Sequence, residues 1–391
     1  MISISLLGTG DYQTAKYRYN DMLCETKYFP YAVKTFFSPS SIIVLMTEEA
    51  RKVHGDELTK LCKYDEVIIP EGKTEIELWE IFDDIITINL PEKSEVILDI
   101  THGFRSQPLI AAASVIYLRT FKGINFSKIL YGAFEARDKT SQETPVFDLK
   151  TFIDLFDWSY AAYEFIENGN ARELRKILVE IQRQRFLQYK KTEFDKIKSF
   201  GLTLDTLTKA LSLVNIKEAF QKASELSEKA EVIISELNNY PESKPFALLF
   251  SKIVDKIEPI SHAHMDLFNN YGIKAQIEII KWFLDTVQYQ QAVTLMCELF
   301  ITHKCLEEKL EPLERENREK ISKTLGGFIQ KQKNKEMLTN EDKEYLSIWN
   351  DLSKTRNEIN HAGMNKEFVK SSSHLTRIKD LFPKLKELIG L

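Results

Sequence analysis

Residues 95–103 read Glu-Val-Ile-Leu-Asp-Ile-Thr-His-Gly, a short apolar run that ends in a polar loop containing a glycine. Its length and its β-branched residues favour a buried strand over a helix. Similar runs lie at Ile2–Leu7, Ser41–Met46, Glu66–Ile69 and Lys128–Gly132, with helical patterns between or after them at Glu75–Ile85 and Pro108–Phe121. This alternation predicts a Rossmann-like α/β fold, with a parallel sheet covered by helices on both faces.

The strand pattern disappears at about Thr151, where apolar residues begin to recur at helical spacing. The first helix of this part is expected to run from Phe152 until Asn168-Gly169 stops it. Further helices are predicted at Arg172–Lys190, Lys217–Leu237, Ala275–Gln288, Gln290–Glu307, Asn340–Asn360 and Ser373–Ile389. We therefore expect two domains, an α/β domain at residues 1–150 and an all-α domain at residues 151–391.

The composition limits the kinds of partner that this protein is expected to bind. Of the 391 residues, 43% are hydrophobic and 28% charged, an ordinary globular balance, and the net charge is −5. Proteins that hold long nucleic acid duplexes usually carry a basic surplus, so we expect no DNA partner and only local contact with single strands. Apolar runs such as Leu109–Leu118 are too short to span a membrane, and the first residues lack a signal-peptide pattern. Four scattered cysteines complete a pattern typical of a cytoplasmic protein.

Two of the expected strands run into loops suited to binding a ligand. In an open parallel sheet, ligands bind beyond the carboxyl ends of the strands. The first strand ends in Gly8, Thr9, Gly10, Asp11 and Tyr12, and the fourth ends in Thr101, His102, Gly103, Phe104 and Arg105. Glycines and exposed amides suit phosphate oxygens, Arg105 suits a bidentate phosphate contact, and Tyr12 or Phe104 suits base stacking.

Simpler explanations of these loops stay open. A Gly-Thr-Gly sequence is a tight turn in most proteins, and a single histidine is often a hydrogen-bonded structural residue. Position 13 is Gln, so the glycine fingerprint of dinucleotide-binding proteins is incomplete and such a cofactor is disfavoured. The residues themselves leave an adenine-nucleotide ligand and a purely structural loop as alternatives.

Asp99-Ile-Thr-His-Gly103 resembles the DxTHG motif of a CRISPR-associated family whose N-terminal domain is a CARF sensor. The Gly8–Tyr12 segment and the strand at Tyr131–Glu135 are also similar to that family. Its members resemble the ancillary ribonucleases of type III CRISPR systems, in which the CARF domain binds cyclic oligoadenylate across a dimer interface. The resemblance implies that Gly8–Tyr12 and Thr101–Arg105 line a cyclic oligoadenylate pocket in a homodimer or a higher oligomer.

A second group of polar residues lies near the C-terminus, in the stretch Arg356-Asn-Glu-Ile-Asn-His361. Residues 345, 349, 352, 356 and 359 follow at helical offsets, which puts Arg356 on an otherwise apolar stripe. A guanidinium there is costly without a partner, so we expect a crevice or a subunit interface. Five helical positions span about 140°, but Gly363 is a plausible helix stop that places His361 in or beyond the last turn.

Arg356, Asn357 and His361 resemble the Rx4–6H motif of HEPN ribonucleases, which are helical domains that accompany CARF domains. The resemblance implies metal-free cleavage of single-stranded RNA by attack of the ribose 2′-hydroxyl, which leaves a 2′,3′-cyclic phosphate. His361 is then the general acid or base, Arg356 stabilises the transition state, and Asn357 orients the histidine or the phosphate. Histidines 262 and 264 are too sparse to form a metal site, and we expect no cofactor or metal.

Two other functions remain as alternatives. One is a ligand-sensing regulatory protein whose helical domain contacts a partner without cutting RNA. The other, which is compatible with ribonuclease activity, is slow cleavage of the cyclic ligand by the sensor domain, with Thr101 and His102 positioning a 2′-hydroxyl. The basic stretch at residues 172–191 suits guidance of RNA, although a solvated helix face explains it as well.

Overall fold

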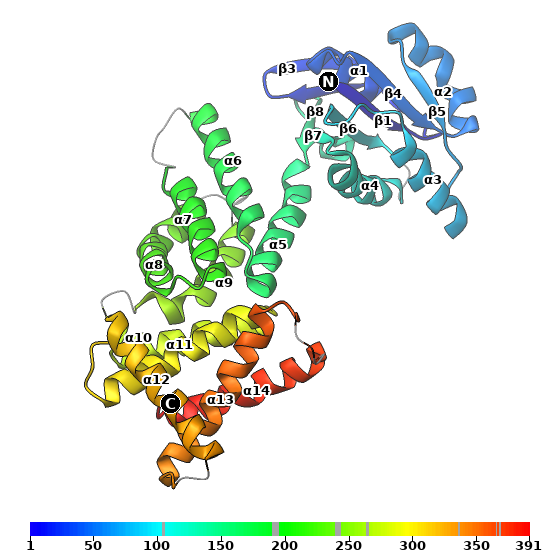
Figure 1. Ribbon diagram of the computed structural model, residues 1–391. Helices are drawn as coiled ribbons and strands as arrows, with labels where there is room; N and C mark the ends of the chain where they lie inside the picture. Colours follow the sequence, from blue (N-terminus) through cyan, green and yellow to red (C-terminus); the bar gives the residue numbers. More distant parts are fainter. Residues whose placement is uncertain are drawn as a thin grey trace. The chain divides into compact units, whose positions relative to one another are not determined.

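The computed structural model describes residues 1–103, 106–189, 195–238, 244–262, 266–334, 337–364, 366 and 369–391. The chain divides into two compact units, Met1–Phe156 and Asp157–Leu391. Helix α5 (Lys150–Asn168) crosses the point of division. Figure 1 follows the elements along the chain, and each unit is described by itself below.

The N-terminal unit contains an eight-stranded sheet in the order β3-β2-β8-β7-β6-β1-β4-β5. Its strands are β1 (Ile2–Leu7), β2 (Ala15–Tyr19), β3 (Met22–Thr26), β4 (Ser41–Met46), β5 (Asp65–Ile68), β6 (Glu95–His102), β7 (Asn125–Gly132) and β8 (Glu143–Asp148). Its helices are α1 (Phe29–Phe37), α2 (Glu48–Leu61), α3 (Glu75–Thr87) and α4 (Gln107–Lys122), with a short 3₁₀ helix η1 (Phe134–Ala136). The unit is therefore α/β, as the sequence predicts.

The sheet is mixed, and this corrects the prediction of a parallel sheet. The strands from β5 to β7 pair in parallel, but β8 is antiparallel to β7 and β3 is antiparallel to β2. The sequence analysis missed the β2–β3 hairpin and β8, which form the edge of the sheet beyond β7. The hairpin turns at Asn20, whose φ of 51° lies in the left-handed region that asparagine tolerates. Short half-exposed strands of this kind carry a weaker apolar signal than the buried centre.

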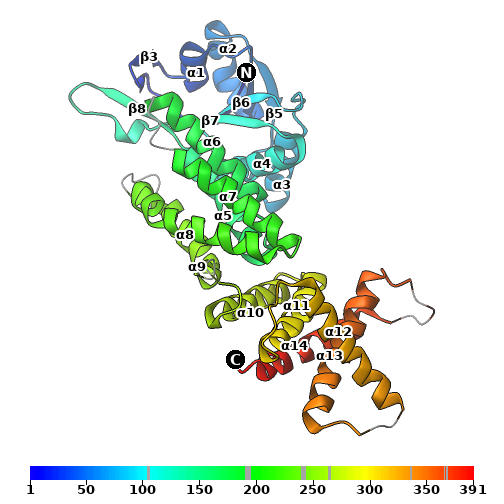
Figure 2. The ribbon, with the colours of Figure 1, turned by 60° about the vertical axis from the view of Figure 1, so that its left-hand side comes forward.

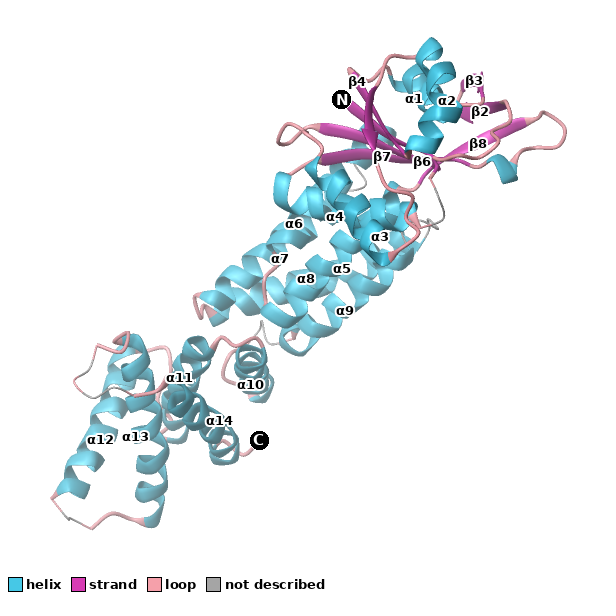
Figure 3. Cartoon of the chain, turned by 90° about the vertical axis from the view of Figure 1, so that its right-hand side faces the viewer, coloured by secondary structure: helices cyan, strands magenta, loops and turns pink. Residues whose placement is uncertain are grey.

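Helices cover both faces of the sheet (Figure 3). Alternate residues of each central strand point to opposite faces. Val96 and Leu98 of β6 belong to the core under α3 and α4, whereas Ile97 belongs to the core under α1. A third cluster joins α2 to the same face as α1 through Val44 and Met46 of β4. Strands β4 and β6 thus contribute apolar side chains to the core on both faces of the sheet, and their apolar runs are among those that the sequence predicts.

The C-terminal unit is all helical in its described residues, as predicted from the loss of the strand pattern. It contains most of α5, then α6 (Arg172–Tyr189), α7 (Asp195–Ser212), α8 (Ile216–Asn238), α9 (Lys244–Ser261), α10 (Asn270–Asp285), α11 (Tyr289–Glu307), α12 (Arg315–Lys333), α13 (Asn340–Asn360) and α14 (Ser371–Leu388). Neighbouring helices from α6 to α9 pack on one another in sequence order. Helices α7 and α9 were not assigned in the sequence analysis, whereas α12 lies within residues 307–335, whose dense charges predict an exposed helical stretch.

Helix α11 is the centre of the last five helices and packs against α10, α12, α13 and α14 (Figure 2). It is buried on several sides, including the thiols of Cys297 and Cys305. On the side facing α13, the Phe300 ring stacks on Trp349 with ring centroids 5.5 Å apart and lies edge-on to Tyr345 at 5.9 Å. The predicted apolar stripe of α13 is therefore the face that packs on α11.

Candidate functional site

The loops after β1 and β6 lie side by side because these strands are parallel neighbours in the sheet. Their register pairs Leu7 with His102, after a β-bulge between Ser5 and Leu7. The amide of Gly8 donates a hydrogen bond of 3.0 Å to the carbonyl oxygen of His102. The structure thus brings the Gly8–Tyr12 segment next to Thr101, His102 and Gly103.

The polar residues of the β6 loop are tied into the sheet. Asp99 is fully buried, and its Oδ1 accepts a hydrogen bond from the amide of Thr101 at 2.8 Å. Burial raises the pKa of Asp99 to about 7, while contacts with Thr101 and Ser5 act in the opposite direction. The Thr101 hydroxyl in turn accepts from the amide of Gly132 on β7, at 2.9 Å. These bonds fix the backbone of the loop where it leaves the sheet.

Gly103 permits a close approach between the two loops. A Cβ on Gly103 would lie 2.9 Å from Cδ1 of Leu6, a separation that real Cβ atoms do not show. Its amide also donates to the carbonyl oxygen of Ile100 at 3.3 Å, which turns the chain tightly after β6. A larger residue in place of the motif's glycine would therefore displace the Leu6 side chain of β1, so close packing favours glycine here independently of any ligand.

Tyr12 folds back over the two loops and contacts two histidines. Its ring centroid lies 4.0 Å from that of His102 and 4.8 Å from that of His54. The Nε2 atom of His102 accepts a hydrogen bond from the amide of Phe29 at 3.2 Å. Removal from water, and secondarily the neighbouring His54, lowers the pKa of His102 to about 4. His102 is thus neutral at pH 7 and offers a ligand no positive charge.

His54, Tyr28 and Glu57 form a supporting network that the sequence analysis missed. His54 Nε2 lies 3.0 Å from the carbonyl oxygen of Gly10, and its Nδ1 lies 3.2 Å from the Tyr28 hydroxyl. That hydroxyl donates to Glu57 at 2.7 Å, and Glu57 also pairs with Lys27. Burial lowers the pKa of His54. The surrounding helix is highly charged in sequence, so no local pattern marks His54 as a residue that holds a loop.

The remaining candidates of the first loop are exposed, namely Thr9, Gly10 and Asp11. Phe104 and Arg105, predicted to bind the ligand, lie outside the described residues. His264, which the sequence analysis considered as a metal ligand, also lies outside them. Within the described part of the chain, no three His, Cys, Asp or Glu side chains gather closely enough to hold a metal ion.

The second candidate group lies at the carboxyl end of α13. The helix ends at Asn360, and His361 follows as its C-terminal cap, so the predicted position of His361 just beyond the helix is confirmed. The chain then turns through Ala362 and Gly363, whose φ values are 54° and 71°, and the amide of Met364 donates to the His361 carbonyl oxygen at 2.9 Å. The glycine accommodates a conformation that most side chains avoid.

Arg356 and Asn357 contact each other directly. The Nε and Nη2 atoms of Arg356 lie 3.3 Å and 3.1 Å from Oδ1 of Asn357. Arg356 is half-buried against α11, while Asn357 and His361 are exposed. The amide of His361 donates to the carbonyl oxygen of Asn357 at 2.9 Å, which joins the two residues through the backbone. Asn357 therefore orients the guanidinium rather than the imidazole in a single chain.

Glu358 anchors this end of α13 to α14. Its side chain is 14% exposed and lies 3.1 Å from Nη1 of Arg377 and 3.5 Å from Nδ1 of His374. Arg377 also donates to the Thr355 hydroxyl at 3.3 Å. On the other side, Gln290 at the start of α11 donates to Oδ1 of Asn360 at 3.2 Å. The candidate residues thus project from a helix end that both neighbours hold.

The fold and the sites define a two-unit protein, in which a largely parallel α/β sheet with clustered edge loops precedes an all-helical unit. Residues 154–261, from α5 to α9, match the family described as CRISPR-associated protein MJ1674, second domain. The chain is also 24% identical, over 306 residues, to the CRISPR-associated protein MJ1674 of Methanocaldococcus jannaschii. That alignment covers 77% of this chain and 42% of the relative, so the chain spans less than half of the relative's length.

These two similarities relate the chain to a CRISPR-associated protein. They agree with the resemblance carried by Asp99-Ile-Thr-His-Gly103, although the family match concerns the helical region and not that motif. Among the described helices, none has the length and apolar character needed to cross a membrane.

Proposed function

We propose that this protein is a cyclic-oligoadenylate-activated, metal-independent endoribonuclease of type III CRISPR defence that acts as a homodimer on single-stranded RNA. The first unit is the CARF sensor and the second is the HEPN ribonuclease. The observation that carries the proposal is the arrangement at the end of α13, where Arg356, hydrogen-bonded to Asn357, lies five residues before the exposed His361. Similarity to a CRISPR-associated protein supports the biological setting.

The chemistry follows from the two residue types. The ribose 2′-oxygen attacks phosphorus, a bond to the 2′-oxygen forms, and the bond to the 5′-oxygen breaks. A base takes the proton of the 2′-hydroxyl, an acid gives one to the leaving 5′-oxygen, and the guanidinium balances charge on the phosphoryl oxygens. Histidine suits both proton transfers near neutral pH. One His361 supplies a single proton-transfer group, so His361 of a second copy completes the site.

In the sensor unit, the proposed ligand binds over the loops that follow the carboxyl ends of β1 and β6. Thr9, Gly10 and Asp11 are exposed there, and glycine and amide groups suit phosphate oxygens. Tyr12 presents an aromatic ring beside them, which suits stacking on adenine. Activation requires the ligand to bind the cutting arrangement more tightly than the resting one.

The two alternatives differ in their support. Ring cleavage by Thr101 and His102 has less support, because Nε2 of His102 already accepts a hydrogen bond from the Phe29 amide and is not available to accept a proton from a 2′-hydroxyl. A regulatory role without cutting uses the same sensor loops, and only a cleavage assay separates it from the ribonuclease.

The test is cleavage of labelled single-stranded RNA in EDTA, with cyclic tetra-adenylate, cyclic hexa-adenylate or no ligand. We expect ligand-dependent products that end in a 2′,3′-cyclic phosphate. The His361→Ala variant is expected to lower the rate by about 10²- to 10⁴-fold, the usual size of a general acid–base contribution. The matched control is His262→Ala, since His262 is also exposed and lies in the helical unit.

Each outcome decides between the functions. Cutting that persists in His361→Ala would contradict the site assignment. Binding of either ring by the full chain without any RNA cutting would favour the regulatory protein. If the His361→Ala variant still degrades the cyclic oligoadenylate, that result would support ring cleavage by the sensor unit.

A further inference from the structure

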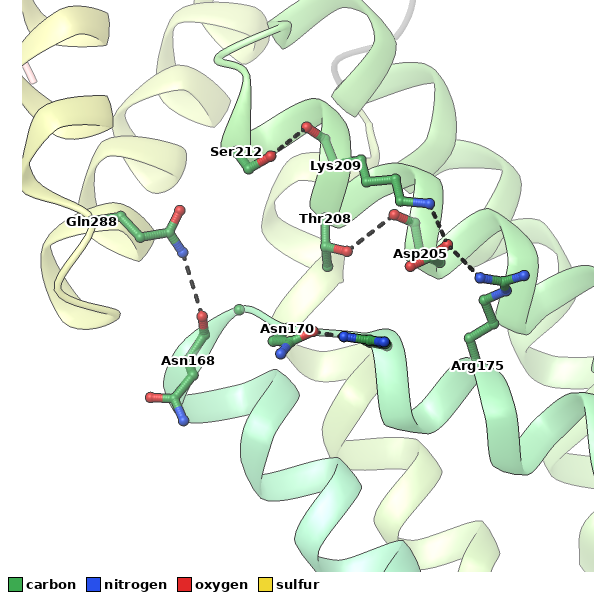
Figure 4. Close-up of a pocket in the computed structure, with 10 residues that line it drawn as sticks. Asn168, Asn170, Arg175, Asp205, Thr208, Lys209, Ser212 and Gln288 are labelled. Atoms are coloured by element: carbon green, nitrogen blue, oxygen red, sulfur yellow. Dashed lines mark hydrogen bonds and ion pairs between the residues drawn. The ribbon is translucent and has the colours of Figure 1, made fainter.

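The helical unit contains a polar pocket of about 410 Å³ where α5, α6, α7 and the turn before α11 meet (Figure 4). The end of α5 contributes the turn Asn168-Gly169-Asn170, and α6 contributes its first residues. Gln288, from the turn before α11, donates to the carbonyl oxygen of Asn168 at 3.5 Å and closes one side. Asn170 caps α6 by accepting from the Arg172 amide at 3.1 Å.

The charge on the walls of this pocket is positive. Its lining includes Arg172, Arg175 and Lys209 but a single carboxylate, Asp205. Asp205 is buried and lies 3.4 Å from Nη1 of Arg175 and 2.8 Å from Nζ of Lys209. The single negative charge of Asp205 is thus shared between two cations. Three cations and one carboxylate leave the pocket lining with a net charge of +2, although the net charge of the protein is −5.

Arg172 and Lys209 are both exposed, and Arg172 differs from Lys209 in lacking a carboxylate partner among the described residues. Arg172 is also the first helical residue of α6. The amide end of a helix adds partial positive charge at the same place. Asn168, Thr208, Ser212 and Gln288 complete the lining with neutral hydrogen-bonding groups. Such a lining suits an anion with several oxygens, and a phosphodiester is the matching chemistry.

The pocket is linked to the candidate ribonuclease residues by the start of α11. Gln288 lines the pocket, and Gln290, two residues later, donates to Asn360 at 3.2 Å. Two residues span at most about 7 Å of chain. Asn360 immediately precedes His361. The N-terminal end of α11 thus contacts both the pocket, through Gln288, and the end of α13, through Gln290.

We propose that this pocket is a backbone-binding subsite for single-stranded RNA, in which Arg172, Arg175 and Lys209 bind a phosphodiester a few nucleotides away from the bond that is cut. The subsite rests on the proposed function, since RNA is its ligand only if the helical unit acts on RNA. It binds phosphate and reads no base, so it raises affinity equally for RNAs of different sequence. It also gives a local role to the basic start of α6.

The test measures how tightly the whole chain binds a short, labelled 2′-O-methyl RNA. This RNA has no free 2′-hydroxyl, so the proposed chemistry cannot cut it. Fluorescence anisotropy measures the Kd between about 50 and 200 mM salt, where phosphate contacts are released. The test variant is Arg172→Ala with Lys209→Ala. The matched control is Arg183→Ala with Lys198→Ala, which removes the same residue types from the exposed surfaces of the same two helices.

We expect the test variant to raise the Kd. The slope of log Kd against log salt concentration should fall by about 0.7, as for the loss of one single-strand phosphate contact. The control is expected to bind nearly as the parent chain does. If both variants weaken RNA binding equally, the RNA is held by general electrostatic attraction and the subsite is overturned. Unchanged RNA binding in the test variant would also overturn it. Absence of RNA binding by the parent chain would overturn it together with the ribonuclease.

The failure of this proposal is distinguishable from failure of the proposed function. If the parent chain binds the RNA through the pocket but does not cut natural RNA, the ribonuclease fails and the subsite stands. If it cuts RNA and the test variant binds like the control, the ribonuclease stands and the subsite fails. Circular dichroism of both variants checks that the helices are retained, since all four residues lie at least partly on the surface.

Discussion

Nη1 of Arg377 lies 3.1 Å from Oε2 of Glu358, and this contact joins α14 to α13 two residues after Arg356. Glu358 sits inside the six-residue stretch that carries the candidate ribonuclease residues, yet it faces away from solvent at 14% exposure. The same stretch thus contains residues suited to chemistry, of which Asn357 and His361 are exposed, and a largely covered residue, Glu358, that holds the helix in place. This division makes stability and activity separable by mutation.

Glu358→Gln is expected to destabilise the protein by about 1–3 kcal/mol, because it removes a charged acceptor and leaves Arg377 and His374 without their shared carboxylate. Urea unfolding of the full-length chain measures the change. Glu344→Gln is the matched control, since Glu344 is exposed on the same helix, and it should change stability by less than about 0.5 kcal/mol. Equal effects of the two substitutions would show that the α13–α14 contact contributes nothing specific.

Arg356→Lys is expected to lower ribonuclease activity by about 10²- to 10³-fold, although it keeps the positive charge. A lysine lacks the planar group that reaches Asn357 through Nε and Nη2 and that matches two phosphate oxygens. Single-turnover cleavage in the presence of cyclic oligoadenylate measures the rate. Lys354→Arg, on the exposed face of α13, is the control. Near-parental activity of the Arg356→Lys variant would mean that charge alone is sufficient.

Asp99→Asn is expected to gain stability relative to the parent chain as the pH rises from about 4 to 7, and to hold that gain above pH 7. The raised pKa of about 7 means that folded Asp99 keeps its proton over this range while the unfolded chain releases it, so ionisation favours unfolding. Urea unfolding at several pH values measures the difference. Asp138→Asn is the control, because amides of Ser141 and Thr140 lower the pKa of exposed Asp138 and keep it ionised. A pH-independent difference for Asp99→Asn would contradict the prediction.

Gly169→Ala is expected to destabilise the helical unit by about 1–2 kcal/mol. Gly169 has a φ of 66°, and a Cβ there would lie 2.8 Å from Nε2 of Gln288 and 3.0 Å from Nε1 of buried Trp282. Gly327→Ala is the comparison variant, and the opposite effect is expected. Gly327 lies inside α12 with no atom within 4 Å of an added Cβ, so the alanine should stabilise the protein by about 0.5–1 kcal/mol. Thermal unfolding that shows the same sign for both would contradict the prediction.

Local patterns were sufficient where a segment is buried on a regular face. The strands at Ile2–Leu7 and Ser41–Met46 were predicted with the bounds that the structure shows, because both are short, mostly apolar runs that are buried along nearly their whole length. The helix at Asn340–Asn360 was also predicted with its observed bounds. Its start is marked by Thr339, whose side chain accepts from the Asp342 amide, and its end by the glycine at 363.

Local patterns did not predict half-exposed strands, or residues whose contact partners lie far away along the chain. The β2–β3 hairpin was missed because its polar residues alternate with apolar ones at the sheet edge. His54 was missed because its partners, Gly10 and Tyr28, lie 44 and 26 residues away along the chain. The polar pocket also escaped the sequence analysis, since its walls come from three helices and a turn.

The sequence by itself determined the α/β-then-α order, the buried strands, the end of α13 and the residue types available for chemistry, because periodicity and helix-stop signals act over a few residues. The tertiary structure decided which of these residues meet. It bonded Thr101 and His102 to backbone amides, bound Arg356 to Asn357 and paired Glu358 with Arg377 of α14. It also placed Gln288 at the pocket and Gln290, two residues later, against Asn360. Such contacts depend on packing between distant segments, which no local pattern encodes.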